Sequence, residues 1–517
     1  MLGFLCKLFV GPSRGVIGAR IAAVAVFTFL FYCRANAGLN FDLENACYLE
    51  LKAEIRMTKI KLNRIIEKAR KSLDEEDASP AFKEAVSDLF EVVSFLTRRL
   101  GLNSQNSSKP PAQDPNRIPP VRTAKGRKRK PGGQKGHKGS YLKPVEKPTE
   151  SEDILIDRRT LPRGAYRHVG FEARQVFNME VSFIVKEYRA EILQNEKGDQ
   201  YVADFPEGIT EAAQYGSTIK AHSVYMSQFQ LIPLARIEDH FKDQLGLPLS
   251  KGSISNWNAL ASKKLESFED WARRSLIGAL CNNADETGIN VGGRRVWLHS
   301  VSNEKVTLFH PDEKRGQEAM ERMGVLPYFR GVLMHDHWKP YFGYSCVHGL
   351  CNAHHLRELE ASIEFDNQKW AGKMKALLMT MRDAVEKSGG ALSKIRVKRF
   401  TEAYRKLLKQ ADKECPDNPK QRAQTKSRNL LVRLRDFEAE TLRFLGDPKV
   451  PFTNNRGEND IRMTKVQQKI SGCFRSMDGA KIFCRVRSYL STCRKNGVGP
   501  SEALRLLFDG KTPSFMN

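Results

Sequence analysis

Residues 280–289 read LCNNADETGI, in which apolar ends flank a pair of asparagines and a pair of acids. Short runs of this kind, bounded by polar turns, are typical of buried strands. In chain order the region contains the strand-like runs Leu280–Ile289, Arg295–Val301 and Lys305–His310, the helical stretch Gln317–Met323 and the apolar run Gly331–His335. We therefore expect three strands in series, then a helix, then a fourth strand that ends at Asp336.

That order of elements is the order of the ribonuclease H architecture, in which helices cover a mixed sheet. It places Asp285 on the first strand and Asp336 at the tip of the fourth. Neighbouring carboxylates repel one another unless a cation lies between them, and Mg²⁺ binds one or two carboxylates together with water and phosphate oxygens. The sequence therefore predicts an α/β fold with a ribonuclease H-like core and a divalent metal site at these two acids.

A clamp for two metal ions requires a third acid, which the chain offers far downstream. Residues 451–462 read PFTNNRGENDIR. Either Asn454 or Asn455 is suited to cap a helix that carries Glu458 in its first turns. We expect Glu458 to complete the site, with the two asparagines as its neighbours.

Arg462 and Lys465 lie on the same face of that predicted helix, where they suit a passing phosphate backbone. Each acid also has a simpler interpretation. Asp285 could cap a turn and Asp336 a helix, while the third acid could pair with Arg462. Taken together with the strand order, the paired asparagines and the basic helix, the three acids favour a catalytic site. We expect Asp285, Asp336 and Glu458 to bind metal and to act in catalysis.

The chain is strongly basic, with 85 Lys and Arg against 60 Asp and Glu, a net charge of +25. At 517 residues and 40% hydrophobic content it is too long for one core and too polar for a membrane bundle, so several folded domains are expected. The excess charge lies in three blocks, Val121–Lys147 at net +9, Leu392–Arg435 at net +10 and Thr453–Lys495 at net +7. Separate basic blocks indicate contacts along a polyanion, most simply nucleic acid, although any one block could be a solvated helix face.

Residues 1–40 form an apolar leader. Basic residues precede the run Ile21–Cys33, and Ala35–Ala37 has the form of a small-residue cleavage site, so the segment is signal-like and too short to span a membrane. The ten cysteines include no CxxC pair and indicate a reducing compartment instead. We interpret the leader as a start-site artefact and expect a cytoplasmic, nucleoid-associated protein.

Residues 41–102 are expected to be helical and zipper-like. A first helix is indicated over Leu43–Leu73, and a second begins at Pro80, with Ser79 as its cap, and stops at Gly101. The apolar residues of the second helix alternate in steps of four and three, at Phe82, Val86, Leu89, Val93, Leu96 and Leu100. Fewer than three heptads do not distinguish a self-association helix from a hairpin folded on the preceding helix, and both interpretations stay open.

Residues 103–148 have the composition of a flexible basic linker. Its glycines do not match the GxxxxGK pattern, so we expect no nucleotide cofactor. The residues of this linker expected to contact DNA are Lys125, Arg127, Lys128, Arg129, Lys130, Lys135 and Lys138.

Residues 149–275 are expected to hold a small strand region followed by a DNA-binding pair of helices. Between Asp153 and Ala203, alternation of apolar residues such as that at 176–185 indicates short strands. Leu231–Leu260 reads as helix, turn and helix, with Ser250 or Ser253 as the second cap. The second helix of such a pair can enter a major groove, although any two helices joined by a Gly-containing turn share the pattern.

Residues 346–359 read CVHGLCNAHHLREL. Their Cys and His side chains could bind zinc, but no second half-site with CxxC spacing exists in the sequence. We favour a helix start in which Cys351 is packed and His354 or Arg357 is directed at the active site.

Several motifs follow one another along the chain: Asn106–Pro111, Pro131–His137, Ala284–Gly288, Met334–Trp338, Cys351–Leu359, Asn454–Glu458 and Lys469–Ser476. Together they resemble a DDE transposase of the insertion sequence 66 family. The resemblance implies that Asp285, Asp336 and Glu458 are the DDE triad of a catalytic domain over residues 276–470. It also implies a basic helical insertion over about 360–447, followed by a C-terminal helical region over 471–517.

Two features depart from the family pattern. Members commonly carry a cysteine-rich zinc-binding segment after the basic linker, whereas Thr149–Phe205 contains no cysteine. The apolar leader is also foreign to the family. Metal-supported DNA binding by this segment is therefore not expected here.

The resemblance implies an enzyme that binds the terminal inverted repeats of its element and catalyses metal-dependent DNA cleavage and strand transfer. Two Mg²⁺ ions are the expected cofactors, with Mn²⁺ as a substitute. The expected partners are double-stranded DNA of the element ends and the target, a second copy bound through the zipper-like helix, and accessory proteins of the element. Two rivals stay open: a ribonuclease H-fold nuclease that cleaves without joining, and a non-catalytic repressor derived from a transposase.

Overall fold

The computed structural model describes residues 71, 75, 79–100, 102–107, 142–417 and 424–516. The leader, nearly all of the first expected helix and most of the basic linker lie outside these residues. So do the linker residues expected to contact DNA, Lys125, Arg127, Lys128, Arg129, Lys130, Lys135 and Lys138. Within the described ranges, no helix is both long enough and apolar enough to cross a membrane.

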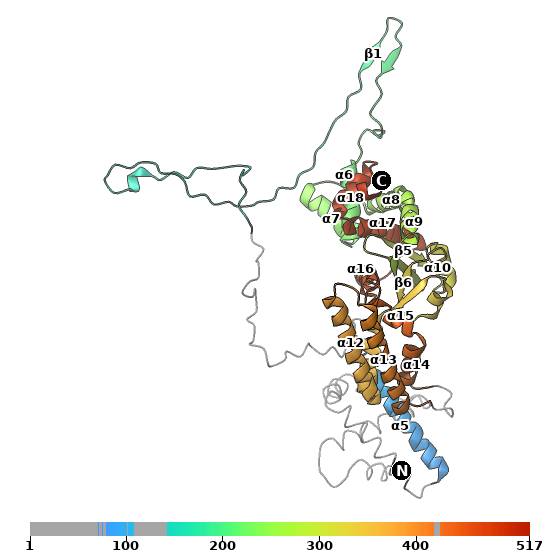
Figure 1. The fold of residues 1–517 in the computed structure, drawn as a ribbon. Coiled ribbons are helices and arrows are strands. Elements are labelled where there is room, and N and C mark those ends of the chain that lie inside the picture. Colours follow the sequence, from blue (N-terminus) through green and yellow to red (C-terminus); the bar gives the residue numbers. More distant parts are fainter. Residues whose placement is uncertain are drawn as a thin grey trace, which may run out of the picture.

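A five-stranded mixed sheet lies in the middle of the folded part of the chain (Figure 1). Its strands are β3 (Cys281–Val291), β4 (Arg294–Ser302), β5 (Thr307–Asp312), β6 (Val332–His335) and β7 (Val347–Leu350). The spatial order is β5-β4-β3-β6-β7, in which β3, β4 and β5 are antiparallel and β6 and β7 join in parallel. Helix α10 (Gln317–Met323) separates β5 from β6 along the chain. The predicted succession of three strands, a helix and a fourth strand is confirmed.

Strands β3 and β4 are joined by a two-residue hairpin turn. Val291 pairs with Arg294, so only Gly292 and Gly293 form the loop. Both glycines have positive φ angles, 56° and 83°, which a two-residue hairpin turn requires and which glycine adopts at little cost. The turn fixes the register of β3 against β4.

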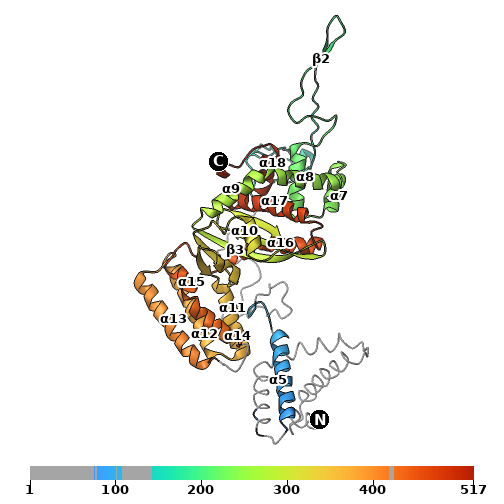
Figure 2. The same cartoon turned by 90° about the vertical axis from the view of Figure 1, so that its right-hand side faces the viewer.

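Helices cover both faces of the sheet (Figure 2). On one face Ala284 and Leu308 pack in a large core with the helices α6 (Ser217–Val224), α7 (Leu234–Leu245), α8 (Lys251–Lys264), α9 (Glu266–Ile277), α17 (Met477–Lys495) and α18 (Pro500–Phe508). On the other face Ile289 packs with Ile461 of α16 (Asn455–Ser471) and with Phe483 of α17. Because side chains alternate along a strand, odd-numbered residues of β3 face α16 and even-numbered residues face away.

A second helical body follows β7 in the chain. It consists of α11 (Asn352–Asp366), α12 (Lys369–Lys387), α13 (Lys394–Glu414), α14 (Lys426–Asp436) and α15 (Glu438–Leu442). Its core contains the fully buried Trp370 and Tyr404 and continues onto Val332 and Met334 of β6. The body begins at Asn352, before the range of about 360–447 predicted for a basic helical insertion, and its helices α12 to α15 lie within that range. Helices α13 and α14 carry the basic block 392–435.

Helix α5 (Pro80–Leu100) begins at the predicted proline and lies near the far end of α11. Arg98 forms an ion pair with Asp366 at 3.0 Å, and its guanidinium lies 5.6 Å from the centre of the Phe365 ring. Beyond the helix, Asn106 donates a hydrogen bond of 2.5 Å from Nδ2 to Glu364. The N-terminal helix is therefore tied to the end of α11 that lies furthest from the sheet.

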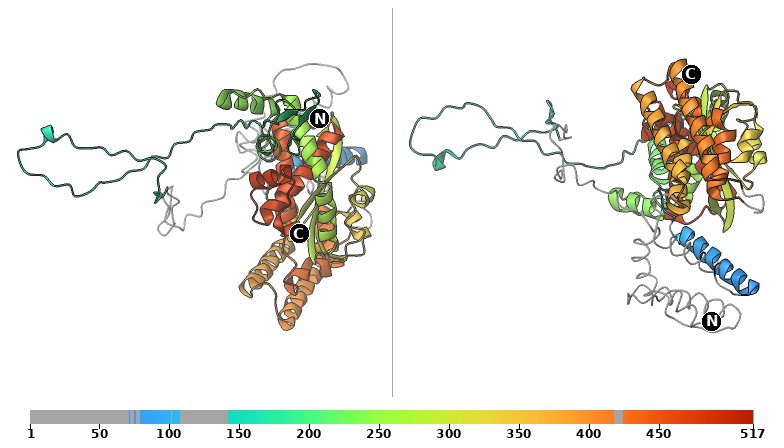
Figure 3. Two further views of the ribbon diagram at one scale, coloured as in Figure 1. Left: turned by 90° about the horizontal axis from the view of Figure 1, so that it is seen from above. Right: turned by 60° about the horizontal axis from the view of Figure 1, so that its bottom comes forward.

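Residues 142–216 are mostly extended and exposed, and they project away from the folded body (Figure 1, Figure 3). The only strands in this stretch are β1 (Ile192–Gln194) and β2 (Gln200–Val202), which form a short antiparallel hairpin. The prediction of short strands between Asp153 and Ala203 is confirmed at β1 and β2, whereas residues 176–185 form no strand. Alternation of apolar side chains does not make a strand unless a second strand pairs with its backbone N–H and C=O groups.

The predicted helix, turn and helix is confirmed as local structure. Helix α7 ends at Gly246, whose φ of 61° closes the helix in the left-handed conformation. Ser250 caps α8, because its side chain accepts a hydrogen bond from the backbone N–H of Ser253. The second helix is longer than predicted and extends to Lys264, while Leu231 lies outside the first.

Candidate active site

Two aspartates lie on adjacent parallel strands, Asp285 within β3 and Asp336 directly after the end of β6. Asn283 of β3 pairs with Met334 of β6. Continuing that register by two residues places Asp285 opposite Asp336, which follows directly after β6. Asn283 faces α16, because its side-chain amide donates a hydrogen bond of 2.7 Å to Asn454. Residues two apart share a face, so both carboxylates are on the α16 side of the sheet.

The two carboxyl groups are partly buried, and the charge of Asp336 disfavours ionisation of Asp285. Burial raises the pKa of Asp285 well above its usual value, and the charges of Glu286, Asp336 and Glu458 raise it further. Burial also raises the pKa of Asp336 to about 6, with a contribution from Glu286. Asp336 accepts one backbone hydrogen bond, from Trp338 at 2.9 Å. A divalent cation between these groups would relieve the repulsion, so the acids fit a metal site.

The sequence NNRGE holds α16 tightly against β3. Asn454 occupies the N-cap position, but its side chain does not cap the helix as predicted. It accepts from Asn283 and donates 2.8 Å to the carbonyl of Ala284, so it joins the helix to the strand. A Cβ at Gly457 would lie 3.2 Å from the Asn454 side chain and 3.5 Å from Asn283, so glycine permits the close approach. Glu458 follows this contact point directly.

Glu458 lies beside α11. Its Oε1 is 3.8 Å from Nδ1 of His354 and 3.6 Å from Arg357. Burial, together with the charges of Arg357 and Arg433, lowers the pKa of His354 to about 4. The imidazole is therefore neutral near pH 7. The ion pair with Arg462 that served as the simpler interpretation is absent from the described residues, and Arg462 is exposed. The side chain of Glu458 therefore contacts residues of α11 and forms no ion pair within its own helix in the described part of the chain.

Cys351 lies at the N-cap position of α11, next to His354 and Glu458. It is buried, and its Sγ accepts a hydrogen bond of 3.1 Å from the backbone N–H of Asn454. Cys351 is thus packed at the start of the helix, and His354 and Arg357 lie close to Glu458. The ligand atoms of Cys351, His354 and Glu458 lie within 4.8 Å of one another, so this trio is a second set of donors that could hold a metal.

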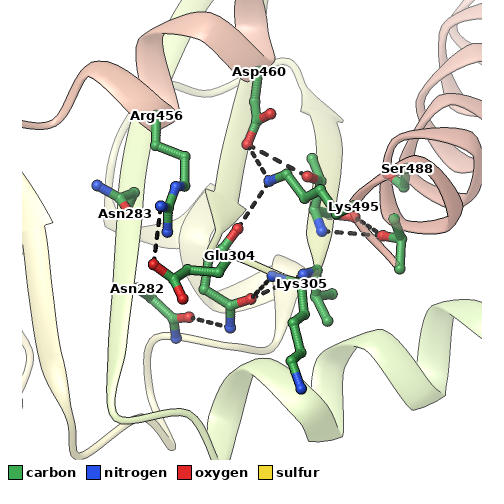
Figure 4. A network of polar contacts seen from close by, with 12 residues as sticks. Asn282, Asn283, Glu304, Lys305, Arg456, Asp460, Ser488 and Lys495 are labelled. Carbon is green, nitrogen blue, oxygen red and sulfur yellow. Dashed lines mark hydrogen bonds and ion pairs between the residues drawn. The ribbon is translucent and has the colours of Figure 1, made fainter. Parts of the chain in front are cut away.

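A polar network anchors the opposite side of α16 (Figure 4). Lys495 of α17 donates hydrogen bonds of 2.7 Å to Asp460 and 2.9 Å to the carbonyl of Asn303. Arg456, on the first turn of α16, pairs with Glu304 at 3.1 Å. These contacts join α16 and α17 to the turn between β4 and β5. The position of Glu458 is therefore fixed by contacts on both sides of its helix.

The other expected residues of α16 differ in their surroundings. Lys465 donates 2.7 Å to the carbonyl of Gly288, and burial together with Arg295 lowers its pKa. It is therefore engaged with β3 rather than extended toward solvent. Arg462 and Asn455 are exposed on the outer side of the helix.

Comparison with known families places these residues in context. The family model described as Transposase IS66 family matches residues 212–482, more than half of the chain. The chain belongs to the IS66 family of transposases. The matched range contains the whole sheet and α16, and hence Asp285, Asp336 and Glu458. A family of unknown function matches residues 46–143, and no curated protein matches the chain.

One part of this IS66 family chain was not anticipated from its sequence. Glu286 points away from Asp285 and receives a hydrogen bond of 2.6 Å from Tyr341 and two from Arg315, at 2.7 and 3.1 Å. The guanidinium of Arg315 also lies against the rings of Trp297 and Trp338, at 4.6 and 4.4 Å from their centres. Strand alternation alone indicates that Glu286 lies on the opposite face and needs a buried partner. The partners come from distant segments with no signal in the sequence.

Proposed function

We propose that the protein is a DDE transposase that cuts the ends of its element and joins them to target DNA, with Asp285, Asp336 and Glu458 as its catalytic triad. The observation that carries the proposal is the pairing of β3 with β6, which aligns the two partly buried aspartates on the face where α16 presents Glu458. The strand order β5-β4-β3-β6-β7 supports a ribonuclease H-like core. The family match supports a DNA-processing role.

The three acids have the chemistry of a two-metal site. Their oxygens are hard ligands, and the raised pKa values of Asp285 and Asp336 indicate a site that lacks a neutralising charge of its own. Bound Mg²⁺, or Mn²⁺ in its place, would supply Lewis-acid activation of water and then of a DNA 3′-hydroxyl. Other residues of the chain position the acids: Asn454 joins the start of α16 to β3, and Glu286 joins β3 to Arg315.

DNA would approach along the basic surfaces. We assign Arg462 and the basic helices α13 and α14 to phosphate contacts, and the second helix of the α7–α8 pair to groove contacts. Self-association is assigned to α5, since Phe95 and Leu96 are 60% and 40% exposed on this helix. Accessory proteins of the element stay among the proposed partners.

The test compares acid variants on DNA that carries the inverted repeats flanking the gene. Asp285→Asn and Glu458→Gln keep the size of each side chain and should reduce Mg²⁺-dependent cleavage and joining by at least about 10³-fold, because each removes a metal ligand. DNA binding in a gel-shift assay should stay within a few fold. Asp509→Asn, an exposed aspartate after α18, is the matched control and should cut and join normally.

The outcomes separate the proposal from its rivals. Hydrolysed ends without joined products in the unmodified protein would support a nuclease and overturn strand transfer. Tight end binding with no cleavage in Mg²⁺ or Mn²⁺ would support a repressor. Undiminished cleavage by Asp285→Asn protein would overturn the assignment of the triad.

A further inference from the structure

Two buried polar atoms beside the site lack any hydrogen-bond partner. They are Nδ1 of His354 and Oε1 of Glu458, which lie 3.8 Å apart. This separation is too long for a hydrogen bond between them. It is close to the spacing of roughly 3.4 Å between two ligands of one tetrahedral ion whose bonds are about 2.1 Å long. A small cation between the two atoms would satisfy both.

Cys351 supplies a third donor to the same point. Its Sγ lies within 4.8 Å of the other two ligand atoms. The hydrogen bond from the Asn454 backbone to the sulfur restricts its orientation and favours the thiolate, as contacts to metal-bound sulfur commonly do. Three protein ligands of the sulfur, nitrogen and carboxylate types, with a fourth position left for water, form a recurrent zinc arrangement.

The charges decide which ions this trio would bind. The thiolate and the carboxylate together balance a divalent cation, whereas Arg357, 3.6 Å from Glu458, opposes it. The buried Cys351 sulfur is a soft ligand, so the site favours an ion that binds sulfur well. Mg²⁺ prefers oxygen ligands, whereas Zn²⁺, Co²⁺ and Cd²⁺ bind sulfur.

We propose that Cys351, His354 and Glu458 form a binding site for a thiophilic divalent cation such as Zn²⁺, distinct from the site of the two aspartates but sharing Glu458 with it. An ion bound there would hold the Glu458 carboxylate toward α11. The carboxylate would then be less available to the aspartates on β3 and β6. Zn²⁺ should therefore inhibit the Mg²⁺-dependent reaction, and this second step rests on the proposed function.

The binding test uses the full chain, freed of metal with a chelator and titrated with Co²⁺. We expect a near-ultraviolet thiolate-to-cobalt charge-transfer band with a stoichiometry of one. Cys351→Ser should abolish the band and weaken Co²⁺ binding by at least about 100-fold, and His354→Ala should also weaken it. Cys346→Ser makes the same change at a buried cysteine outside the trio and should leave the band intact. Absence of the band in the unmodified protein, or its persistence in Cys351→Ser protein of unchanged thermal stability, would overturn the proposal.

The inhibition test measures cleavage of end-bearing DNA in Mg²⁺ with added Zn²⁺. Micromolar Zn²⁺ should inhibit the unmodified protein and should inhibit Cys351→Ser protein far less. Equal inhibition of both would overturn the competition for Glu458. Because the cobalt titration does not require activity, its result stands even if the protein cleaves no DNA, so failure of the site and failure of the proposed function are distinguishable.

Discussion

Replacing Asp336 by asparagine should stabilise the metal-free protein while it impairs the site. Folding raises the pKa of this carboxyl from its usual value of 3.8 to about 6. A pKa difference of one between the folded and unfolded states corresponds to about 1.4 kcal/mol, so ionised Asp336 lowers the free energy of unfolding by about 3 kcal/mol at pH 7. Asparagine has no charge to bury, and its carbonyl oxygen can still accept the hydrogen bond from the Trp338 amide.

The effect has a defined pH window. Because the folded pKa is raised, the folded state binds the extra proton between pH 3.8 and about 6, and stability from this group falls as the pH rises through that range. Above about pH 6 the destabilisation is complete. The difference between Asp336→Asn and the unmodified protein should therefore be small near pH 4 and largest at pH 7 and above.

Thermal and urea unfolding in a chelating buffer at several pH values measures this difference. At pH 7.5 we expect the variant to melt several degrees higher, since 1 kcal/mol shifts the midpoint of a domain of about 150–250 residues by about 2–4 °C. Mg²⁺ should stabilise the unmodified protein more than the variant, because the ligand is lost. A variant that melts at or below the unmodified protein at pH 7.5, or a difference that does not depend on pH, would refute the reasoning.

Asp312→Asn is the matched control, because the same substitution should change the free energy of unfolding in the opposite direction. Burial would raise the pKa of Asp312, but hydrogen bonds from Arg322 and from the Lys314 amide outweigh burial and bring the pKa to about 2. The same substitution should therefore destabilise the protein at this position and stabilise it at Asp336. Equal effects at both positions would show that the cost of burying the ionised Asp336 carboxylate is not the cause.

Three further outcomes are expected. Asn454→Ala leaves the Asn283 amide and the Ala284 carbonyl without partners in a buried contact, so it should lower the free energy of unfolding by about 2–4 kcal/mol in urea denaturation and reduce cleavage as well. The apparent affinity for Mg²⁺, measured by calorimetry, should fall about tenfold per pH unit below pH 6, because protons then compete for Asp336. Arg462→Ala should weaken DNA binding and lower the slope of log K against log salt by about 1, whereas an unchanged slope would exclude a phosphate contact.

The elements around the sheet were predictable because each has a local signal. The acidic segment of β3 and the apolar run of β6 have the lengths and compositions of strands, and Pro80, Gly246 and Ser250 mark helix ends by well-defined backbone chemistry. The succession of these elements then predicts that Asp285 and Asp336 are neighbours. The pairing of Asn283 with Met334, continued by two residues, brings Asp285 opposite Asp336.

Features that depend on partners distant in the sequence were not predictable. Residues 176–185 have the alternation of a strand but pair with no strand in the described part of the chain. Asn454 has the residue type of a helix cap, yet its side chain bonds to β3, because α16 packs closely at Gly457. Arg315 comes from the segment after β5, and nothing in its neighbourhood indicates that it pairs with Glu286.

Helix α11 connects two regions that are otherwise separate. It begins at the cysteine beside Glu458 and ends at Asp366, where Arg98 of the N-terminal helix is attached. A helix of 15 residues is a rod about 22 Å long. A tilt of roughly 5° about its far end would displace His354, about 18 Å along the helix, by about 1.6 Å. Nδ1 of His354 lies 3.8 Å from Oε1 of Glu458. A displacement of the N-terminal helix that tilts α11 would therefore change the surroundings of the third acid.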